Sequence, residues 1–261
     1  MTLGATPTPA QILAELGQPF PYTFPDARTR WLADLAASDP IVFPTSFANK
    51  QSVKVAQTVA DAGGSSPHTF SAVNFGLAFP DRVLFACTCL RGNSGADLSI
   101  TNVTIGGVTA AGHDNREWFG GGPAVGAGIF AAAVPNGTSG DVVVTWTGQA
   151  ANAAGLILLS AAKVSTTEYA FTSNSFSGGG TTASNTINIP TNGLLILNSV
   201  HSNTNAATLS GVTERASLTV GVAHFKVGFD NRMNLETARP ISASWTTTAV
   251  RGFKAISYTQ G

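Results

Sequence analysis

The sequence predicts a mainly β protein built from two tandem antiparallel β-sandwich repeats of a jelly-roll-like kind, preceded by a short helical N-terminal arm. Three observations lead to this fold class. The chain carries one strand pattern twice. From residue 53 onward, short runs alternate apolar and polar residues, with Gly, Asn, Ser and Pro between them. Charged residues make up only 11% of the 261 residues, against about a quarter in ordinary domains, and such a composition is typical of a turn-rich β protein.

The duplicated pattern divides the chain into a docking arm at 1–50, a first repeat at 51–165 and a second repeat at 166–261. The matching segments are 83–85 with 194–196, 107–109 with 211–213, 125–130 with 220–225, 142–146 with 241–245, and 155–156 with 252–253. Whatever differs between the copies is not needed for the shared fold. These differences are therefore where functional residues are sought.

The N-terminal arm is predicted to contain two short helices. Thr8 and Gln11 have the spacing of a capping box, and Pro9 suits the first helical position. A second helix is expected from about Asp26 to Ala36. The apolar stripes of these helices supply the candidate docking residues Ile12, Leu13, Leu16, Trp31, Leu32 and Leu35. Fifty residues bury too little surface to fold alone, so the arm must pack on the β region, on a sister subunit or on a larger assembly.

Two tryptophans and two cysteines are expected in the core. In the segments 142–146 and 241–245, every second residue is apolar in both copies, which marks the buried face of a strand. Trp146 and Trp245 are therefore interpreted as core anchors. Cys87 and Cys89 lie two apart in a predicted strand, and the second copy has Asn and Val there. The cysteines are accordingly interpreted as small buried hydrophobes, and no metal ligand is expected.

The two copies differ most after their shared Gly-Val-Thr segment. The offset between copies is 104 residues at Gly107 and 95 at Val125, so the first copy is nine residues longer here. The excess is flanked by glycines and is expected to project as a loop. Its candidate contact residues are His113, Asp114, Arg116, Glu117, Trp118 and Phe119. Two interpretations stay open: a subunit contact or solvated loop, and a sugar platform made by Trp with Asp and Arg nearby.

The sequence offers little for catalysis, cofactors or nucleic acid. The formal net charge is zero, whereas binding to phosphate backbones needs clustered Lys and Arg. No apolar stretch of about 18 residues could span a bilayer, and the N-terminus lacks the pattern of a signal peptide. No nucleophile elbow, phosphate loop or paired-histidine motif is present. His224 aligns with Ile129 of the other copy and is interpreted as structural. Asp114 and Glu117 are interpreted as solvated charges of the loop, with a carboxylate pair for glycoside cleavage as the alternative.

Residues 8–17 and 38–47 together resemble a leader found in tail and other virion proteins of tailed bacteriophages and gene transfer agents. The usual leader is a Ser-x-x-Gln-Ile-x-x-Glu-Leu/Phe-Gly helix, followed by a Gly-Pro-Ile-Ser segment. This chain departs from it with Asp39 for the glycine and Val42 for the serine. The hairpin sequence at 134–146 also resembles small sandwich modules of such particles.

The resemblance implies a non-enzymatic structural virion subunit, such as part of a tail, fibre base or head spike. It implies a homo-oligomer, trimeric or pentameric, that is docked by its arm, assembled in the bacterial cytoplasm and released with the particle. Its expected partners are sister subunits and other virion proteins, with host surface polysaccharide as a further contact, and it uses no cofactor. Two alternatives remain: a carbohydrate-binding module or adhesin acting through residues 113–119, and a polysaccharide-degrading enzyme.

Overall fold

The computed structural model describes residues 8, 11–12, 27–33, 52–94, 98–118, 123–176 and 180–260, with backbone alone at 27–29, 114–118, 176 and 232. In the arm, Gln11 and Ile12 are helical and α2 spans Ala27–Ala33. The first repeat contains β1 (Val53–Asp61), β2 (His68–Asn74), β3 (Arg82–Gly92), β4 (Leu98–Ile105), β5 (Val108–Thr109), β6 (Ala111–Trp118), β7 (Ala124–Ala133), β8 (Ser139–Gly148) and β9 (Ala153–Ala162). The second contains β10 (Val164–Phe176), β11 (Thr182–Ile189), β12 (Gly193–His201), β13 (Thr208–Ser210), β14 (Glu214–Val220), β15 (Ala223–Met233), β16 (Glu236–Ser244) and β17 (Arg251–Gln260).

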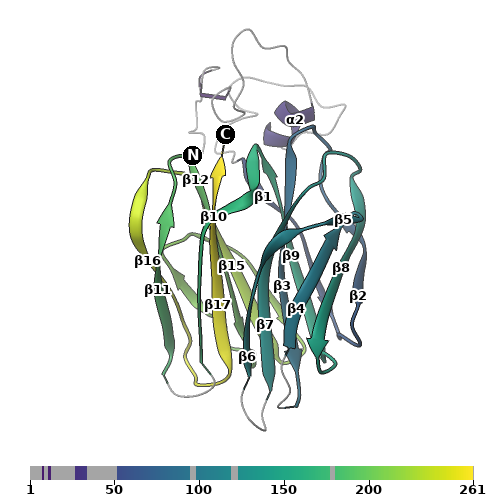
Figure 1. Ribbon diagram of the computed structural model, residues 1–261, viewed down its shortest axis with the longest axis vertical. Coiled ribbons are helices and arrows are strands. Elements are labelled where there is room, and N and C mark those ends of the chain that lie inside the picture. The colour runs from purple at the N-terminus through teal and green to yellow at the C-terminus, as the bar shows by residue number, and fades with distance from the viewer. Residues whose placement is uncertain are drawn as a thin grey trace.

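The strands form four antiparallel sheets, arranged as two sandwich-like bodies (Figure 1). In the first body, an inner sheet of order β1-β9-β3-β7-β6 packs on an outer sheet of order β2-β8-β4-β5. In the second, an inner sheet β10-β17-β12-β15-β14 packs on an outer sheet β11-β16-β13. The prediction of a mainly β protein with two antiparallel sandwiches is confirmed.

The two inner sheets pack against each other, so the molecule is four sheets deep. Side chains from both inner sheets form one cluster, including Phe85, Ile129 and Ile157 of the first repeat and Phe225 and Ile256 of the second. Such central strands are buried on both faces. In β3, Val83, Phe85, Cys87 and Cys89 point into this central cluster, while Leu84, Ala86 and Leu90 point toward the first outer sheet.

Strand pairing gives the true correspondence of the copies. Cys89 pairs with Gly155 in the first inner sheet, and Val200 pairs with Gly252 in the second, which supports both of those sequence matches. Across the other edge, Cys89 faces Ala127 while Val200 faces Phe225. The match of 125–130 with 220–225 is therefore wrong by three residues, because strand register follows the neighbouring strand and not a short Val-Gly likeness.

Burial supports the interpretation of the core residues. Trp146 and Trp245 are each 4% exposed; Trp146 lies on the inward face of β8, and Trp245 directly follows β16 and belongs to the core of the second sandwich. Cys87 and Cys89 are buried free thiols, and burial raises the pKa of both. Across the central interface, the counterpart of Cys87, Asn198, donates hydrogen bonds of 3.0 Å from Nδ2 to the carbonyl oxygens of Thr88 and Gly128. At this position the first repeat has the buried, apolar Cys87, and the second repeat has Asn198, whose hydrogen bonds connect the two repeats.

Candidate functional site

The described part of the excess segment is a strand, and residues 119–122 lie outside the described residues. Residues 111–118 form β6, the edge strand of the first inner sheet, which pairs with β7 from Ala111 opposite Ala131 to Trp118 opposite Ala124. The corrected register makes the excess six residues, since the offset in β7 and β15 is 98 and the offset at Gly107 is 104. The described hairpin is longer in the first copy: the pair Glu117–Val125 corresponds to Val220–Ala223, and one further pair, Trp118–Ala124, extends it.

Of the predicted contact residues, the structure brings His113 into a defined cluster. Asp114, Arg116, Glu117 and Trp118 lie on β6 by their backbone, and Phe119 is outside the described residues. Positions 114 and 117 are an odd number of residues apart along one strand, so they belong to opposite faces of the sheet. That placement does not favour the carboxylate pair that glycoside cleavage requires.

His113 contacts the second repeat. Its Nε2 lies 2.9 Å from Oε1 of Glu168 on β10, and its ring stacks on Phe171 with the centroids 4.1 Å apart. On the neighbouring strand β17, Lys254 Nζ lies 4.5 Å from the centre of the Phe171 ring. The hydrogen bond with His113, helped by the charges of His113 and Lys254, lowers the pKa of Glu168. His113 therefore joins the edges of the two inner sheets.

The exposed aromatic side chains beside this cluster are Tyr169 and Phe171, which are 51% and 53% exposed. Phe171 is engaged by His113 and by the Lys254 ammonium, so its ring is not free to stack on a sugar. The contacts of His113 with Glu168 and Phe171 thus hold the two repeats together at this edge.

The described docking-arm residues pack on the chain's own first repeat. Ile12, Trp31 and Leu32 are buried against Phe79 and Ala162 at one end of the β body (Figure 1). Leu13, Leu16 and Leu35 lie outside the described residues. The predicted capping box is present: the Thr8 amide donates to Gln11 Oε1 at 2.7 Å, and the Gln11 amide donates to Thr8 Oγ1 at 3.2 Å.

A lysine of the β body fixes the second helix of the arm. Lys54 Nζ donates hydrogen bonds to the carbonyl oxygens of Trp31 and Leu32 and lies 4.9 Å from the centre of the Trp31 ring. A cation at the last turn of a helix is favourable because the free carbonyl groups carry partial negative charge there. Of the three alternatives for the arm, packing on the β region is the one that these described residues follow.

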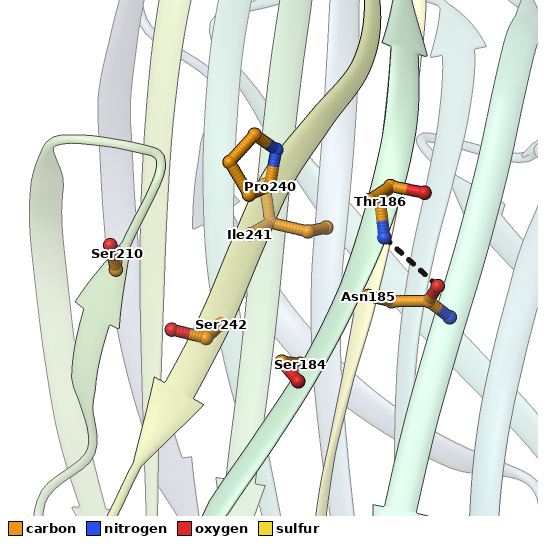
Figure 2. A pocket seen from close by; sticks show the side chains of 7 residues that line it. All are labelled: Ser184, Asn185, Thr186, Ser210, Pro240, Ile241 and Ser242. Carbon is orange, nitrogen blue, oxygen red and sulfur yellow. Dashed lines mark hydrogen bonds between the residues drawn. The ribbon is translucent and has the colours of Figure 1, made fainter.

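A groove of about 390 Å³ lies on the solvent face of the second outer sheet (Figure 2). It is lined by Ser184, Asn185, Thr186, Ser210, Pro240, Ile241 and Ser242. The three serines form one cross-strand row, because Ser242 of β16 pairs with Ser184 of β11 and with Ser210 of β13. The lining side chains carry no charge, so the groove offers hydroxyl and amide groups beside the apolar surface of Pro240.

The groove exists because β13 is short. The strand ends at Ser210, and Gly211 follows with a φ of 85°, a left-handed conformation that favours glycine. A Cβ at Gly211 would lie 2.5 Å from the Pro240 carbonyl oxygen. The matching Gly107 has a φ of 80°, so both copies use the same turn. Sequence reasoning found the turn but missed the groove, because alternating hydroxyl residues read simply as an exposed strand face.

Among the described residues, no three His, Cys, Asp or Glu side chains gather as a metal centre would require. In the same part of the chain, no helix is long and apolar enough to cross a membrane.

Comparison with protein-family models, with curated proteins and with solved structures finds no match to this chain. The likeness of the arm to phage leaders therefore depends on its own motif.

Proposed function

We propose that this chain is a non-enzymatic structural subunit of a phage-like particle, forming part of a tail, a fibre base or a head spike. The observation that carries the proposal is the combination of a leader-like arm with a duplicated β body that is poor in charged residues. Thr8 and Gln11, two positions of the leader-like segment, make the reciprocal hydrogen bonds of a capping box.

The strand order supports a jelly-roll reading of each sandwich. In both repeats, successive strands alternate between the two sheets except at the hairpins β4–β5, β6–β7 and β14–β15: β1-β9-β3-β7 lies against β2-β8-β4, and β10-β17-β12-β15 lies against β11-β16-β13. This interleaving is the kind expected of a jelly roll, a fold that viral capsid and lectin domains use. Fold likeness is an analogy, and here it agrees with what the arm implies.

The position of the arm suggests how the subunit is oriented in a particle. The described arm residues lie at one end of the β body, and the β16–β17 connection lies at the opposite end (Figure 1). In the proposed arrangement the arm end faces the particle and the opposite end faces outward. Docking would use arm surfaces other than Trp31 and Leu32, because these side chains are occupied by the first repeat.

Particle composition tests this proposal. In particles purified on a density gradient from a culture that carries the gene, mass spectrometry is expected to find several copies of the chain per particle. The purified chain should have a light-scattering mass that is a multiple of 26.7 kDa, as a trimer or pentamer. A chain lacking residues 1–50 should keep its β circular dichroism and be absent from particles. A wild-type chain that stays monomeric and never sediments with particles would overturn the proposal.

The groove on the second outer sheet favours a second candidate function, binding of neutral glycans during host attachment. A neutral saccharide needs several hydroxyl or amide partners and an apolar surface, and the groove has both. A glycan array should show binding that Ser242→Arg abolishes by filling the groove. The earlier alternative, a platform at residues 113–119, predicts instead that Trp118→Ala abolishes binding. If neither variant changes the array, or if no glycan binds, this candidate is wrong.

A further inference from the structure

A row of basic side chains crosses the second inner sheet at its loop end, defined here as the connections 202–207 and 245–250. His201 of β12 pairs with His224 of β15 on one side and with Arg251 of β17 on the other. His201 and Arg251 have no exposed surface, and His224 is 8% exposed. Paired residues of neighbouring strands point to the same face, so the three side chains line one end of the second sandwich.

The first repeat has an apolar row at the equivalent place. There Leu90 pairs with Gly126 and with Ala154, and both Leu90 and Ala154 belong to the hydrophobic core. The fold therefore does not require histidine or arginine at this point. Burying titratable side chains in place of apolar ones costs free energy. The row is therefore the most informative difference between the interiors of the two repeats.

The surroundings of His201 are tight and polar. Its ring stacks on Trp245 with centroids 5.8 Å apart and planes 20° apart, and the Arg251 guanidinium lies 5.6 Å from the Trp245 ring centre. Asn203 and Thr247, which bond to each other across the two loops at 3.1 Å, lie beside it. No hydrogen bond of good geometry reaches either ring nitrogen of His201, or Nδ1 of His224.

The charges around the two imidazoles oppose protonation. Burial lowers the pKa of His201, and the positive charge of Arg251 adds to this effect against the opposing contacts of Asn203 and Thr247. Burial also lowers the pKa of His224, with Lys226 of the same strand contributing. Lys226 forms an ion pair with Glu214 of β14, whose Oε2 lies 2.9 Å from Lys226 Nζ. Within the described residues, no carboxylate forms an ion pair with either histidine.

We propose that His201 and His224 form an acid-sensitive latch, which holds the loop end of the second repeat closed at neutral pH and releases it as the pH falls. Closed packing requires two neutral rings, because protonation would place two cations beside Arg251 and Lys226 without a counter-ion. Opening exposes both rings to water, where they take up protons.

The linkage between protonation and folding gives the direction of the pH effect on the closed form and the pH range in which it occurs. A histidine whose folded-state pKa is depressed binds fewer protons closed than open, so the closed form loses stability as the pH falls below about 6.5, the ordinary histidine pKa, down to the folded-state pKa. In that window the opening equilibrium constant rises up to about tenfold per pH unit for one histidine, and up to about a hundredfold for two. The first repeat should show no such change at its loop end.

Hydrogen exchange on the full-length protein tests the latch. Exchange at 193–210 and 241–255 is compared between pH 7.5 and 5.0 with that at 82–105 and 142–155, after normalising to the unfolded chain. The second-repeat peptides are expected to lose protection selectively at pH 5.0. Equal change in both repeats, or none in either, would overturn the proposal. A second measurement needs no variant: if ring nitrogen NMR shows either imidazole titrating near its ordinary pKa while the repeat stays closed, the latch does not exist.

Two histidine variants and one control variant test the latch further. His201→Leu copies the residue of the first repeat, and His224→Gln keeps a neutral polar group. Each should reduce the acid-induced change in exchange about tenfold per pH unit. The matched control is His68→Gln in the first repeat, where the imidazole lies 3.7 Å from Asp61, and it should leave the second-repeat response unchanged. A response of wild-type size in both latch variants contradicts the proposal.

Discussion

Arg82 shows how one side chain can fix two connections. It is fully buried, and its guanidinium donates five hydrogen bonds to backbone carbonyl oxygens. The acceptors are at 76–77, before β3, and at 134 and 136–137, between β7 and β8. The equivalent position in the second repeat is Gly193, where a Cβ would lie 2.6 Å from Ile189. The arginine therefore belongs to one copy and is not a requirement of the fold.

Replacing Arg82 by lysine tests this role. Arg82→Lys keeps the charge but cannot reach five acceptors with three donors, so buried carbonyl groups lose their partners. The free energy of unfolding, measured with urea, should fall by about 3 kcal/mol. Arg239→Lys is the control, because Arg239 is only partly buried and pairs with Glu236 within β16. It should cost about 0.5 kcal/mol, and equal losses would contradict the role given to Arg82.

At the scale of elements, the edge strands β6 and β10 are joined by His113 and Glu168. Both side chains remain about one-third exposed, at 34% and 30%, so solvent screens their interaction. Glu168 also protects the edge of β10, because a charge directed toward a neighbouring sheet discourages pairing with another chain.

The depressed pKa of Glu168 predicts an acid dependence for this contact. A carboxyl with a lowered folded-state pKa stabilises the fold fully above its unfolded pKa of about 4.3, and this stabilisation is lost as the pH falls through the folded-state value. Glu168→Gln should lower the unfolding free energy by about 0.5 kcal/mol at pH 7 and by less at pH 3. His113→Ala should have a similar effect, and the double variant should add little. Additive losses would show that the two side chains are not coupled.

The sequence predicted which residues lie on buried strand faces better than how the strands pair with one another. Trp146 and Trp245 were recognised as core because alternation on a strand with one solvent face is visible in a single sequence. For β3, alternation gives no such information, because both of its faces are buried and apolar residues fill both. The register of β15 was missed for a different reason: it is set by backbone pairing with β12, and no local pattern records it.

The candidate sites were harder to predict than the fold. His113 was selected from the difference between copies, yet its partner Glu168 is 55 residues away and belongs to the other repeat. His201 and His224 looked scattered because a cross-strand pair is separated by a whole hairpin in sequence. The groove of serines depends on where β13 ends, which follows from the turn at Gly211.

At the scale of the whole molecule, the arm covers one end of the β body. Leu32 is fully buried with Phe79 and Ala162, and Lys54 holds the last carbonyls of α2. The apolar residues at this end would be exposed to water without the arm. The arm thus contributes to the solubility of the first repeat as well as to any contact with a particle.

Leu32→Ala should weaken the attachment of the arm. Removing a buried leucine side chain costs about 2–4 kcal/mol, which is a large fraction of what so short a segment can gain by docking. Limited proteolysis should cleave within residues 1–50 faster than in the wild type, while the β body stays resistant. Val108→Ala, at a side chain 42% exposed in the first repeat, should leave the cleavage rate unchanged. Equal rates for Leu32→Ala and the wild type would show that the arm is held elsewhere.

The contact between the inner sheets has a consequence for the origin of the protein. Each repeat covers the largest apolar face of the other, and the same structural element supplies both sides. The pair is in effect a homodimer joined by the single residue Lys163 between β9 and β10. A gene encoding one repeat would have produced a protein that dimerised through this face, and fusion would have made the dimer permanent. A fused pair is not bound by symmetry, so the two halves can differ at one position, as they do with Cys87 in the first and Asn198 in the second.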